Sequence, residues 1–215
     1  MSGPTAGWIE DLTRTISSRL VVTEDDDEGE IAARRRRDAL RAFERSLPPV
    51  YRWARLDHPD FRPPVSPLPT RPPSAKRVVF SGHAGTGKTT VAVALLRALL
   101  EGKIASHPFG ADDDVAAVAR QCRFAAAHRL GVAALVPGDP LEIRRAMRAP
   151  IVLIDDLGKD ADINSNPVPS IIAERHAEER VTWVTTELSP DAIANRYGGG
   201  IARRIFESAE LIRFR

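Results

Sequence analysis

The alternation of apolar and polar positions changes character near residue 75. Residues 30–46 contain helix formers, no proline or glycine, and apolar Ile31, Leu40 and Phe43, and they predict one charged helix. Beyond residue 75, short apolar runs alternate with amphipathic segments, and they predict strands at 77–81, 132–136, 151–154, 181–185 and 211–214. Helices are expected at 87–100, 112–130, 141–147, 169–179, 191–196 and 201–208. Strands alternating with helices predict an α/β fold, a five-stranded parallel sheet with helices on both faces.

Charge and proline divide the chain into three parts. The acidic run at 24–30 precedes four consecutive arginines at 34–37, and nine of the 17 prolines lie between Pro48 and Pro73. Because proline lacks the amide donor and restricts φ, this stretch predicts a semi-extended linker. We therefore expect a charged helical arm over 1–46, a Pro-rich linker and lead-in over 47–75, and a core over 76–215. The arm is either a solvated helix or an arm that docks on a partner or binds nucleic acid.

Composition narrows the class of protein. Of 215 residues, 31 are basic and 29 acidic, and the resulting net charge of +2 neither favours nor excludes a polyanionic partner. The single Cys122 excludes a disulfide framework and a cysteine-based zinc site. No apolar run approaches the roughly 18–20 residues of a membrane helix, and the N-terminus lacks a signal-peptide pattern. We therefore expect a cytoplasmic protein with no membrane contact.

The strongest chemical signal follows the first predicted strand of the core. The sequence matches G-x-x-x-x-G-K-[ST] directly before a predicted helix, which is the context of a phosphate-binding P-loop. Its backbone amides and helix N-terminus bind phosphate, while the lysine and the hydroxyl address the terminal phosphates and Mg²⁺. We expect ATP to contact Gly82, His83, Ala84, Gly85, Thr86, Gly87, Lys88, Thr89 and Thr90, with Thr89 also a ligand of Mg²⁺.

A second signal is the apolar run 151–154, which leads into two carboxylates, Asp155 and Asp156. Ligands of open α/β sheets bind at the carboxyl ends of the strands, so this pair is expected beside the P-loop. Asp155 would hold Mg²⁺ and Asp156 would polarise the attacking water. Many such ATPases have Glu at the second position, and the shorter Asp predicts slow turnover. The alternative is a strand that ends in a solvated pair of acids.

Two further segments carry candidate residues. Thr186 lies at the end of the strand predicted at 181–185, where a hydroxyl can sense the γ-phosphate, although threonines are common at strand ends. Near the C-terminus, Arg203 and Arg204 point away from the apolar face of a short helix that carries Ile201 and Ile205. Such arginines either reach a neighbouring subunit's γ-phosphate as arginine fingers or form an exposed surface pair.

Together these motifs resemble the DnaC/IstB-like branch of the AAA+ ATPases, the bacterial and phage helicase loaders and transposition helpers. The resemblance covers residues 47–215 and rests on the P-loop, on VLIDDLG at 152–158 and on the LSP and RYG segments at 188–198. It implies an ATPase core without a C-terminal lid and assigns the arginine-finger position to Arg204. The sensor position, usually Asn, is Glu187 here, so the sensing role passes to Thr186.

The resemblance implies a helicase loader in DNA replication that hydrolyses ATP slowly and when stimulated by its partner. Its expected partners are a hexameric replicative helicase, single-stranded DNA and further copies of itself in a ring or spiral. Three alternatives stay open: a transposition helper with the same ATPase core, a P-loop small-molecule kinase, and an adaptor that binds ATP and barely hydrolyses it.

Overall fold

The structure is a computed structural model that describes residues 24–61, 76–101, 122–135, 140–160 and 166–215. Two compact units divide the chain, residues 1–35 and residues 36–215. Helix α2 (Glu24–Ser46) contains the helical segment predicted at 30–46 and spans both units. In the described part of the chain, no helix combines the length and the hydropathy that a bilayer-crossing segment needs.

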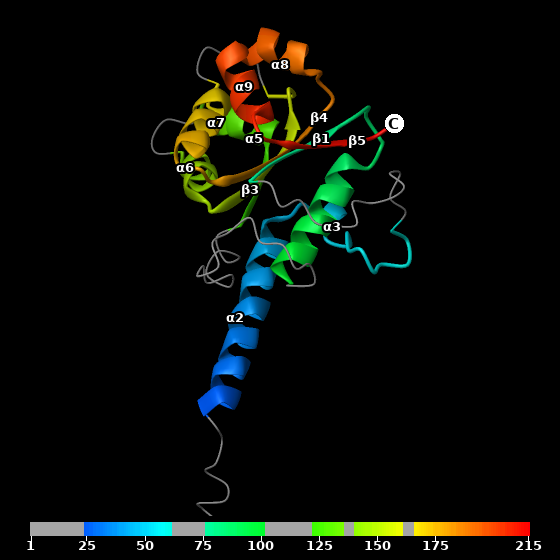
Figure 1. The fold of residues 1–215 in the computed structure, drawn as a ribbon, viewed down its shortest axis with the longest axis vertical. Coiled ribbons are helices and arrows are strands. Elements are labelled where there is room, and N and C mark those ends of the chain that lie inside the picture. Colours follow the sequence, from blue (N-terminus) through cyan, green and yellow to red (C-terminus); the bar gives the residue numbers. More distant parts are fainter. Residues whose placement is uncertain (1–23, 62–75, 102–121, 136–139, 161–165) are drawn as a thin grey trace, which may run out of the picture. The chain divides into compact units, whose positions relative to one another are not determined.

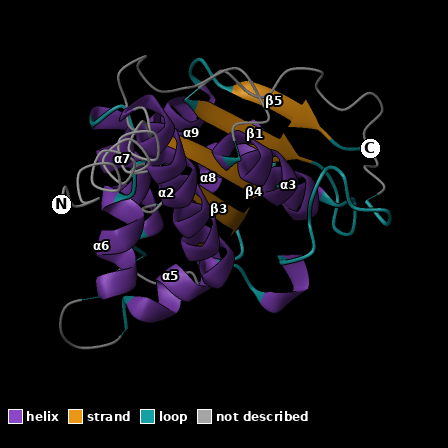
Figure 2. Cartoon of the chain, turned by 90° about the horizontal axis from the view of Figure 1, so that it is seen from below, coloured by secondary structure: helices purple, strands orange, loops and turns teal. Residues whose placement is uncertain are grey.

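A five-stranded sheet with the strand order β2-β3-β4-β1-β5 forms the centre of the second unit. Every neighbouring pair of strands is parallel, and Figure 2 shows β5, β1, β4 and β3 side by side in that order. The strands are β1 (Arg77–Ser81), β2 (Arg123–Ala126), β3 (Ile151–Leu157), β4 (Val181–Thr186) and β5 (Glu210–Arg213). The helical elements that follow α2 are η1 (Pro49–Tyr51), α3 (Lys88–Leu100), α5 (Ala127–Ala133), α6 (Leu141–Arg148), α7 (Val168–Ala177), α8 (Pro190–Tyr197) and α9 (Gly199–Phe206).

Helices cover both faces of the sheet, because successive strand residues point to opposite sides. On β1, Val78 and Phe80 pack in one buried cluster with α3, whereas Val79 packs in a second cluster with α5, α6, α7, α8 and α9. Figure 1 shows α3 on one side of the strands and α6, α7 and α9 on the other. The predicted α/β class, a five-stranded parallel sheet with helices on both faces, is confirmed.

One strand was predicted at the wrong place. Residues 132 and 133 of the strand expected at 132–136 belong to α5, and the second strand of the sheet is β2, within the helix expected at 112–130. The β2 sequence RFAA has low intrinsic strand preference, and its pairing with β3 overrides that preference. Residues 112–121 of the expected helix and residue 136 lie outside the described residues.

The lead-in segment before the first strand packs on the sheet through α3. Leu47, Ala54 and Phe61 are buried in the same cluster as the α3 side chains. Arg97 of α3, only 1% exposed, donates hydrogen bonds to the carbonyl oxygens of Arg52 (3.1 Å) and Ala54 (3.0 Å). The expected linker residues 62–75 lie outside the described residues, and the division of the chain at 46/47 and 75/76 stays a prediction.

Candidate functional site

The predicted P-loop connects the end of β1 to the beginning of α3 at Lys88. Gly87, the residue before α3, has φ = 82°, a left-handed conformation that glycine adopts without a steric penalty. Gly87 has no side chain to cap the helix, so the first amide groups of α3 are available to an anion. The loop therefore has the backbone geometry of an anion site at the carboxyl edge of the sheet.

The lysine of the motif is held against its own loop. Lys88 Nζ donates a 2.6 Å hydrogen bond to the carbonyl oxygen of His83, which also accepts a 2.8 Å bond from Thr86 Oγ1. Burial lowers the pKa of the Lys88 ammonium, and the carboxylates of Glu187 and Asp156 oppose that shift. The ammonium is thus placed at the mouth of the loop, where a phosphate would compensate its partial desolvation.

Two threonines from different elements converge on one carboxylate oxygen. Asp155 Oδ1 accepts hydrogen bonds from Thr89 Oγ1 (2.6 Å) and from Thr185 Oγ1 (2.7 Å). Burial raises the pKa of Asp155 above its usual value, and the two donated hydrogen bonds act in the opposite direction. The P-loop helix and the ends of β3 and β4 are therefore joined at a single buried acid.

Thr89 and Asp155 fit the requirements of a Mg²⁺ ion. Mg²⁺ prefers oxygen ligands and usually takes one or two from the protein, with water and phosphate completing its shell. A hydroxyl and a carboxylate oxygen 2.6 Å apart, at the mouth of a phosphate-binding loop, match that donor set. No cluster of three or more His, Cys, Asp or Glu side chains that suits a metal occurs among the described residues.

Asp156 stands apart from Asp155 through its backbone conformation. Its φ of 55° is unusual for a non-glycine residue, and it lies where the register between β3 and β4 shifts, between Ile154 and Leu157. Its amide donates to Thr185 Oγ1 (2.9 Å), and its carboxylate lies 3.5 Å from Lys159 Nζ. This register shift is a β-bulge, and because of it the side chain of Asp156 does not follow the in–out alternation of β3.

Lys159 connects two of the acidic candidates. Its ammonium lies 3.0 Å from Glu187 Oε1, and this hydrogen bond raises the pKa of Lys159 and lowers that of Glu187. Lys159 was not among the site residues predicted from the sequence. Its only signal is its position three residues after Asp156, where a turn can fold it back towards the acids.

The group adjoins a cavity of about 290 Å³, although Asp155 and Thr185 are not among the residues that line this cavity. Its lining contains six of the nine expected nucleotide contacts, together with Asp156 and three residues that were not predicted there. The lining is Tyr51, Ala84, Gly85, Gly87, Lys88, Thr89, Thr90, Asp156, Lys159 and Glu187. Gly82, His83 and Thr86 belong to the same loop and do not line the cavity.

The structure does not bring Thr186 into this group. Its hydroxyl donates to the carbonyl oxygen of Leu157 (2.8 Å) and accepts from the amide of Leu188 (3.0 Å), and the side chain is fully buried. Thr185 takes the place beside Asp155, because alternation along β4 directs it to the α3 side of the sheet. Strand register, which the sequence does not state, decides between the two neighbouring threonines.

Arg203 and Arg204 lie far from the P-loop of their own chain. Arg204 lines a shallow hollow with Arg77 and Thr182, which stand at the beginnings of β1 and β4, whereas the P-loop follows the end of β1. Arg203 is exposed, and Arg204 donates to the carbonyl oxygen of Gly200 (3.2 Å) in its own helix. Arg204 thus lies at the end of the sheet where the strands begin, and the P-loop lies at the other end.

Comparisons with known proteins bear on the fold. A scan against protein-family models finds no match, and a search of the curated proteins finds none. A solved structure of a proposed primosome component from Streptococcus pyogenes serotype M3 has a TM-score of 0.57 and 16% identity, over 83% of this chain and 95% of its own. The solved structure of DnaI has a TM-score of 0.50 and 17% identity, over 83% and 94%.

This chain therefore shares its fold with the solved structures of DnaI and of the proposed primosome component. The DnaC helicase loader is also similar, with a TM-score of 0.48 and 21% identity over 73% of this chain and 82% of its own. The fold implied by the P-loop, VLIDDLG and RYG segments is confirmed by the similarity to DnaI and to the proposed primosome component.

Proposed function

We propose that this chain is an AAA+ ATPase that binds ATP at the P-loop and acts in DNA replication as a loader of a hexameric helicase. The observation that carries the proposal is the hydrogen bond between Thr89 and Asp155 (2.6 Å). This bond joins the P-loop helix to the end of β3 at the sheet edge where nucleotides bind in open α/β folds.

In this account the loop amides and Lys88 bind the phosphates. Thr89 and Asp155 would hold Mg²⁺, which would supply positive charge to neutralise the terminal phosphates of ATP. The hydroxyl of Thr185 keeps Asp155 oriented towards Thr89. Tyr51, which lines the same cavity, stands beside Thr89, and burial followed by the charge of Asp155 raises the pKa of its phenol. The phenol of Tyr51 therefore stays neutral, and in this proposal it limits the access of water to the nucleotide cavity from the side of residues 47–61.

Hydrolysis requires a base that orients water, and Asp156 takes this role. The ion pair of Asp156 with Lys159 (3.5 Å) restrains the carboxylate near the cavity. The ion pair limits how far this carboxylate can move towards a water molecule, and the Asp side chain is shorter than Glu. Both properties support slow hydrolysis that a partner stimulates.

The position of Arg204 supports assembly into a ring or spiral. Because it lies at the end of the sheet opposite its own P-loop, it serves as an arginine finger only for the nucleotide of a neighbouring copy. Head-to-tail contacts of this kind build rings or open spirals. An arginine supplied across such an interface accelerates phosphoryl transfer by about 10³–10⁵-fold in related systems.

Helicase loading is the function that the similar folds favour, since they include DnaI and a proposed primosome component. Single-stranded DNA and the hexameric helicase are the partners in this proposal. The test is a loading assay with the replicative helicase of the same cell, circular single-stranded DNA and ATP. Wild-type protein should increase the helicase retained on the DNA circle, and Lys88→Ala should abolish that increase.

Lys76→Ala is the matched control, because it removes an exposed lysine that pairs with Glu179 (2.6 Å) away from the cavity. This variant should load helicase like the wild type. A chain that hydrolyses ATP normally but neither binds the helicase nor alters its retention on DNA would refute the loader assignment and leave the ATPase assignment standing.

A further inference from the structure

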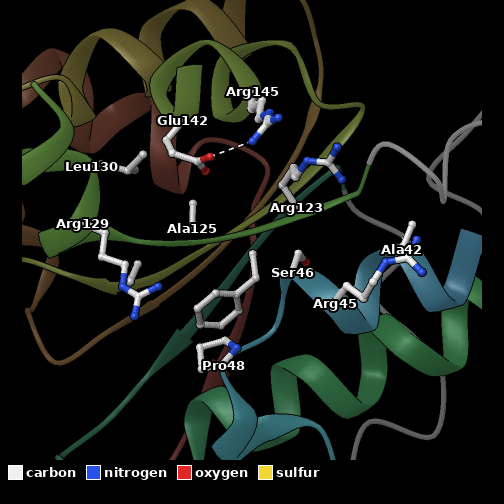
Figure 3. A pocket seen from close by; sticks show the side chains of 12 residues that line it. Ala42, Arg45, Ser46, Pro48, Arg123, Ala125, Arg129, Leu130, Glu142 and Arg145 are labelled. Carbon is white, nitrogen blue, oxygen red and sulfur yellow. Dashed lines mark hydrogen bonds and ion pairs between the residues drawn. The ribbon is translucent and has the colours of Figure 1, made fainter. Parts of the chain in front are cut away.

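An arginine-lined hollow of about 460 Å³ shares no lining residue with the nucleotide cavity. It is formed by the C-terminal end of α2, the edge strand β2 and the helices α5 and α6. Each of these elements contributes one arginine, and Figure 3 shows Arg45, Arg123, Arg129 and Arg145 around the opening. Glu142 is the one acidic residue in this lining.

A second hollow of about 330 Å³ continues the first. The two share Arg123 and Arg145, and the second adds Arg144 and Arg148 from the outer side of α6. We name the combined surface the arginine groove, defined by Arg45, Arg123, Arg129, Arg144, Arg145 and Arg148. Six guanidinium groups and one carboxylate therefore line a continuous depression.

Arginine side chains outnumber acidic side chains in this lining. Glu142 accepts a 2.8 Å hydrogen bond from Arg145, as Figure 3 shows, and this pair is exposed. Arg45 and Arg129 are exposed at the two ends of the hollow. Like charges gathered in one depression repel one another, and an anionic ligand relieves that repulsion when it binds.

The groove also contains an aromatic ring. Phe124 of β2 lines the first hollow and contacts Tyr51, with 5.8 Å between the ring centroids. Guanidinium groups bind phosphates bidentately and stack on flat rings, and aromatic side chains stack on unpaired bases. An acidic peptide uses the charges but has no need of the ring, so the combination favours single-stranded nucleic acid.

We propose that the arginine groove binds the backbone of single-stranded DNA, with Arg45 and Arg129 as phosphate contacts and Phe124 as the ring against which a base packs. This inference rests on the proposed function, because it names the surface through which the loader contacts DNA. It places that contact beside the edge strand β2 and outside the nucleotide cavity.

The test measures binding of a fluorescent oligo-dT by anisotropy, with the full chain, ATP and Mg²⁺, across a series of salt concentrations. Each phosphate contact on single strands contributes about 0.7 to the slope of log K against log salt. The Arg45→Ala/Arg129→Ala variant should therefore lower the slope by about 1.4 and weaken binding about tenfold near 0.15 M salt. Arg45→Lys/Arg129→Lys should recover most of the affinity, because lysine keeps the charge.

Arg213→Ala/Arg215→Ala is the matched control, since both arginines are exposed, β5 is the opposite edge of the sheet, and neither residue lines the nucleotide cavity. This variant should keep the wild-type slope. Equal affinities and slopes for the groove variant and this control would overturn the inference, as would a wild-type chain that binds no oligo-dT. Loss of binding to a poly-glutamate probe with unchanged DNA binding would assign the groove to an acidic peptide and also overturn it.

ATP hydrolysis and helicase retention, measured on the same samples, separate this inference from the proposed function. A groove variant with normal DNA binding and normal loading refutes only the groove. A wild-type chain without ATP hydrolysis and without helicase binding refutes the proposed function itself.

Discussion

Thr185→Val and Thr186→Val test whether Thr185 acts in the nucleotide site or only stabilises the fold. The two threonines are neighbours at the end of β4. Thr185 and Thr186 are both fully buried, and each hydroxyl donates one hydrogen bond and accepts one from a backbone amide. Only Thr185 donates to Asp155. The substitution keeps the shape of the side chain, so the two variants differ mainly in which polar groups lose their partner.

The expected loss of stability is similar for the two variants. A net contribution of about 1 kcal/mol per hydrogen bond, with the cost of leaving buried partners unpaired, gives about 2–4 kcal/mol for each variant. For a chain of this size, that loss lowers the melting temperature by about 6–12 °C. Thermal unfolding followed by circular dichroism measures this effect and establishes that both variants fold.

The pH dependence of activity should differ between them. The Thr185 hydrogen bond lowers the pKa of Asp155 against the larger effect of burial, so its removal raises that pKa further. Mg²⁺ binds the ionised carboxylate, and the proton competes with it. The rise of Mg²⁺-dependent ATPase activity should therefore move to higher pH in Thr185→Val and stay unchanged in Thr186→Val. Identical pH profiles for the two variants would refute the assignment of Thr185 to the site.

The raised pKa of Asp155 also makes the free energy of unfolding depend on pH. Because the folded pKa of Asp155 is raised, the folded chain binds this proton more tightly than the unfolded chain. Without Mg²⁺, the stabilisation is present below the ordinary pKa of aspartate and is lost as the pH rises through the folded pKa. Addition of Mg²⁺ and ATP should restore stability above that pKa.

Three further predictions concern residues around the site. Asp160 is a buried acid that accepts hydrogen bonds from the Tyr197 hydroxyl and the Gly158 amide. Asp160→Ala should therefore lower the free energy of unfolding, measured by urea denaturation, by about 3–5 kcal/mol. A loss below about 1 kcal/mol would contradict that role. Burial raises the pKa of the Cys122 thiol to about 12, so an alkylating reagent at pH 8 should label it only as the chain unfolds, and rapid labelling without denaturant would contradict its burial. Gly158→Ala should lower the free energy of unfolding by about 1–3 kcal/mol. The φ of Gly158 is 107°, and the new Cβ would lie 2.5 Å from Leu188 Cδ1. An unchanged thermal unfolding curve would refute this prediction.

The sequence predicted most of the fold because its signals are local. The P-loop is a contiguous motif, and the apolar runs that became β1, β3, β4 and β5 are rich in β-branched or aromatic residues. The β2 sequence RFAA was missed because its alanines favour helix, and only pairing with β3 makes it a strand. Alanine-rich edge strands of this kind depend on long-range contacts that a local pattern does not contain.

The sequence named most residues of the candidate site but could not give the orientations of their side chains. Thr89 and Asp155 are 66 residues apart, yet the two sequence motifs that contain them predicted both as ligands of one Mg²⁺ ion. The choice of Thr185 over Thr186 depends on strand alternation at the bulge in β3, and the contribution of Lys159 depends on the turn after it. Such details arise from register and turns, which a single sequence does not specify.

The central claim, an ATP site completed by a neighbouring copy, is tested most directly by mixing two inactive variants. Lys88→Ala removes the phosphate contact within one chain, and Arg204→Ala removes the proposed finger at the opposite end of the sheet. Random head-to-tail assembly of an equimolar mixture places an intact Arg204 against an intact Lys88 at about a quarter of the sites. We predict negligible ATPase activity for each variant alone and about a quarter of wild-type activity for the mixture. Full activity of Arg204→Ala alone, or an inactive mixture of two folded and assembling variants, would contradict the account.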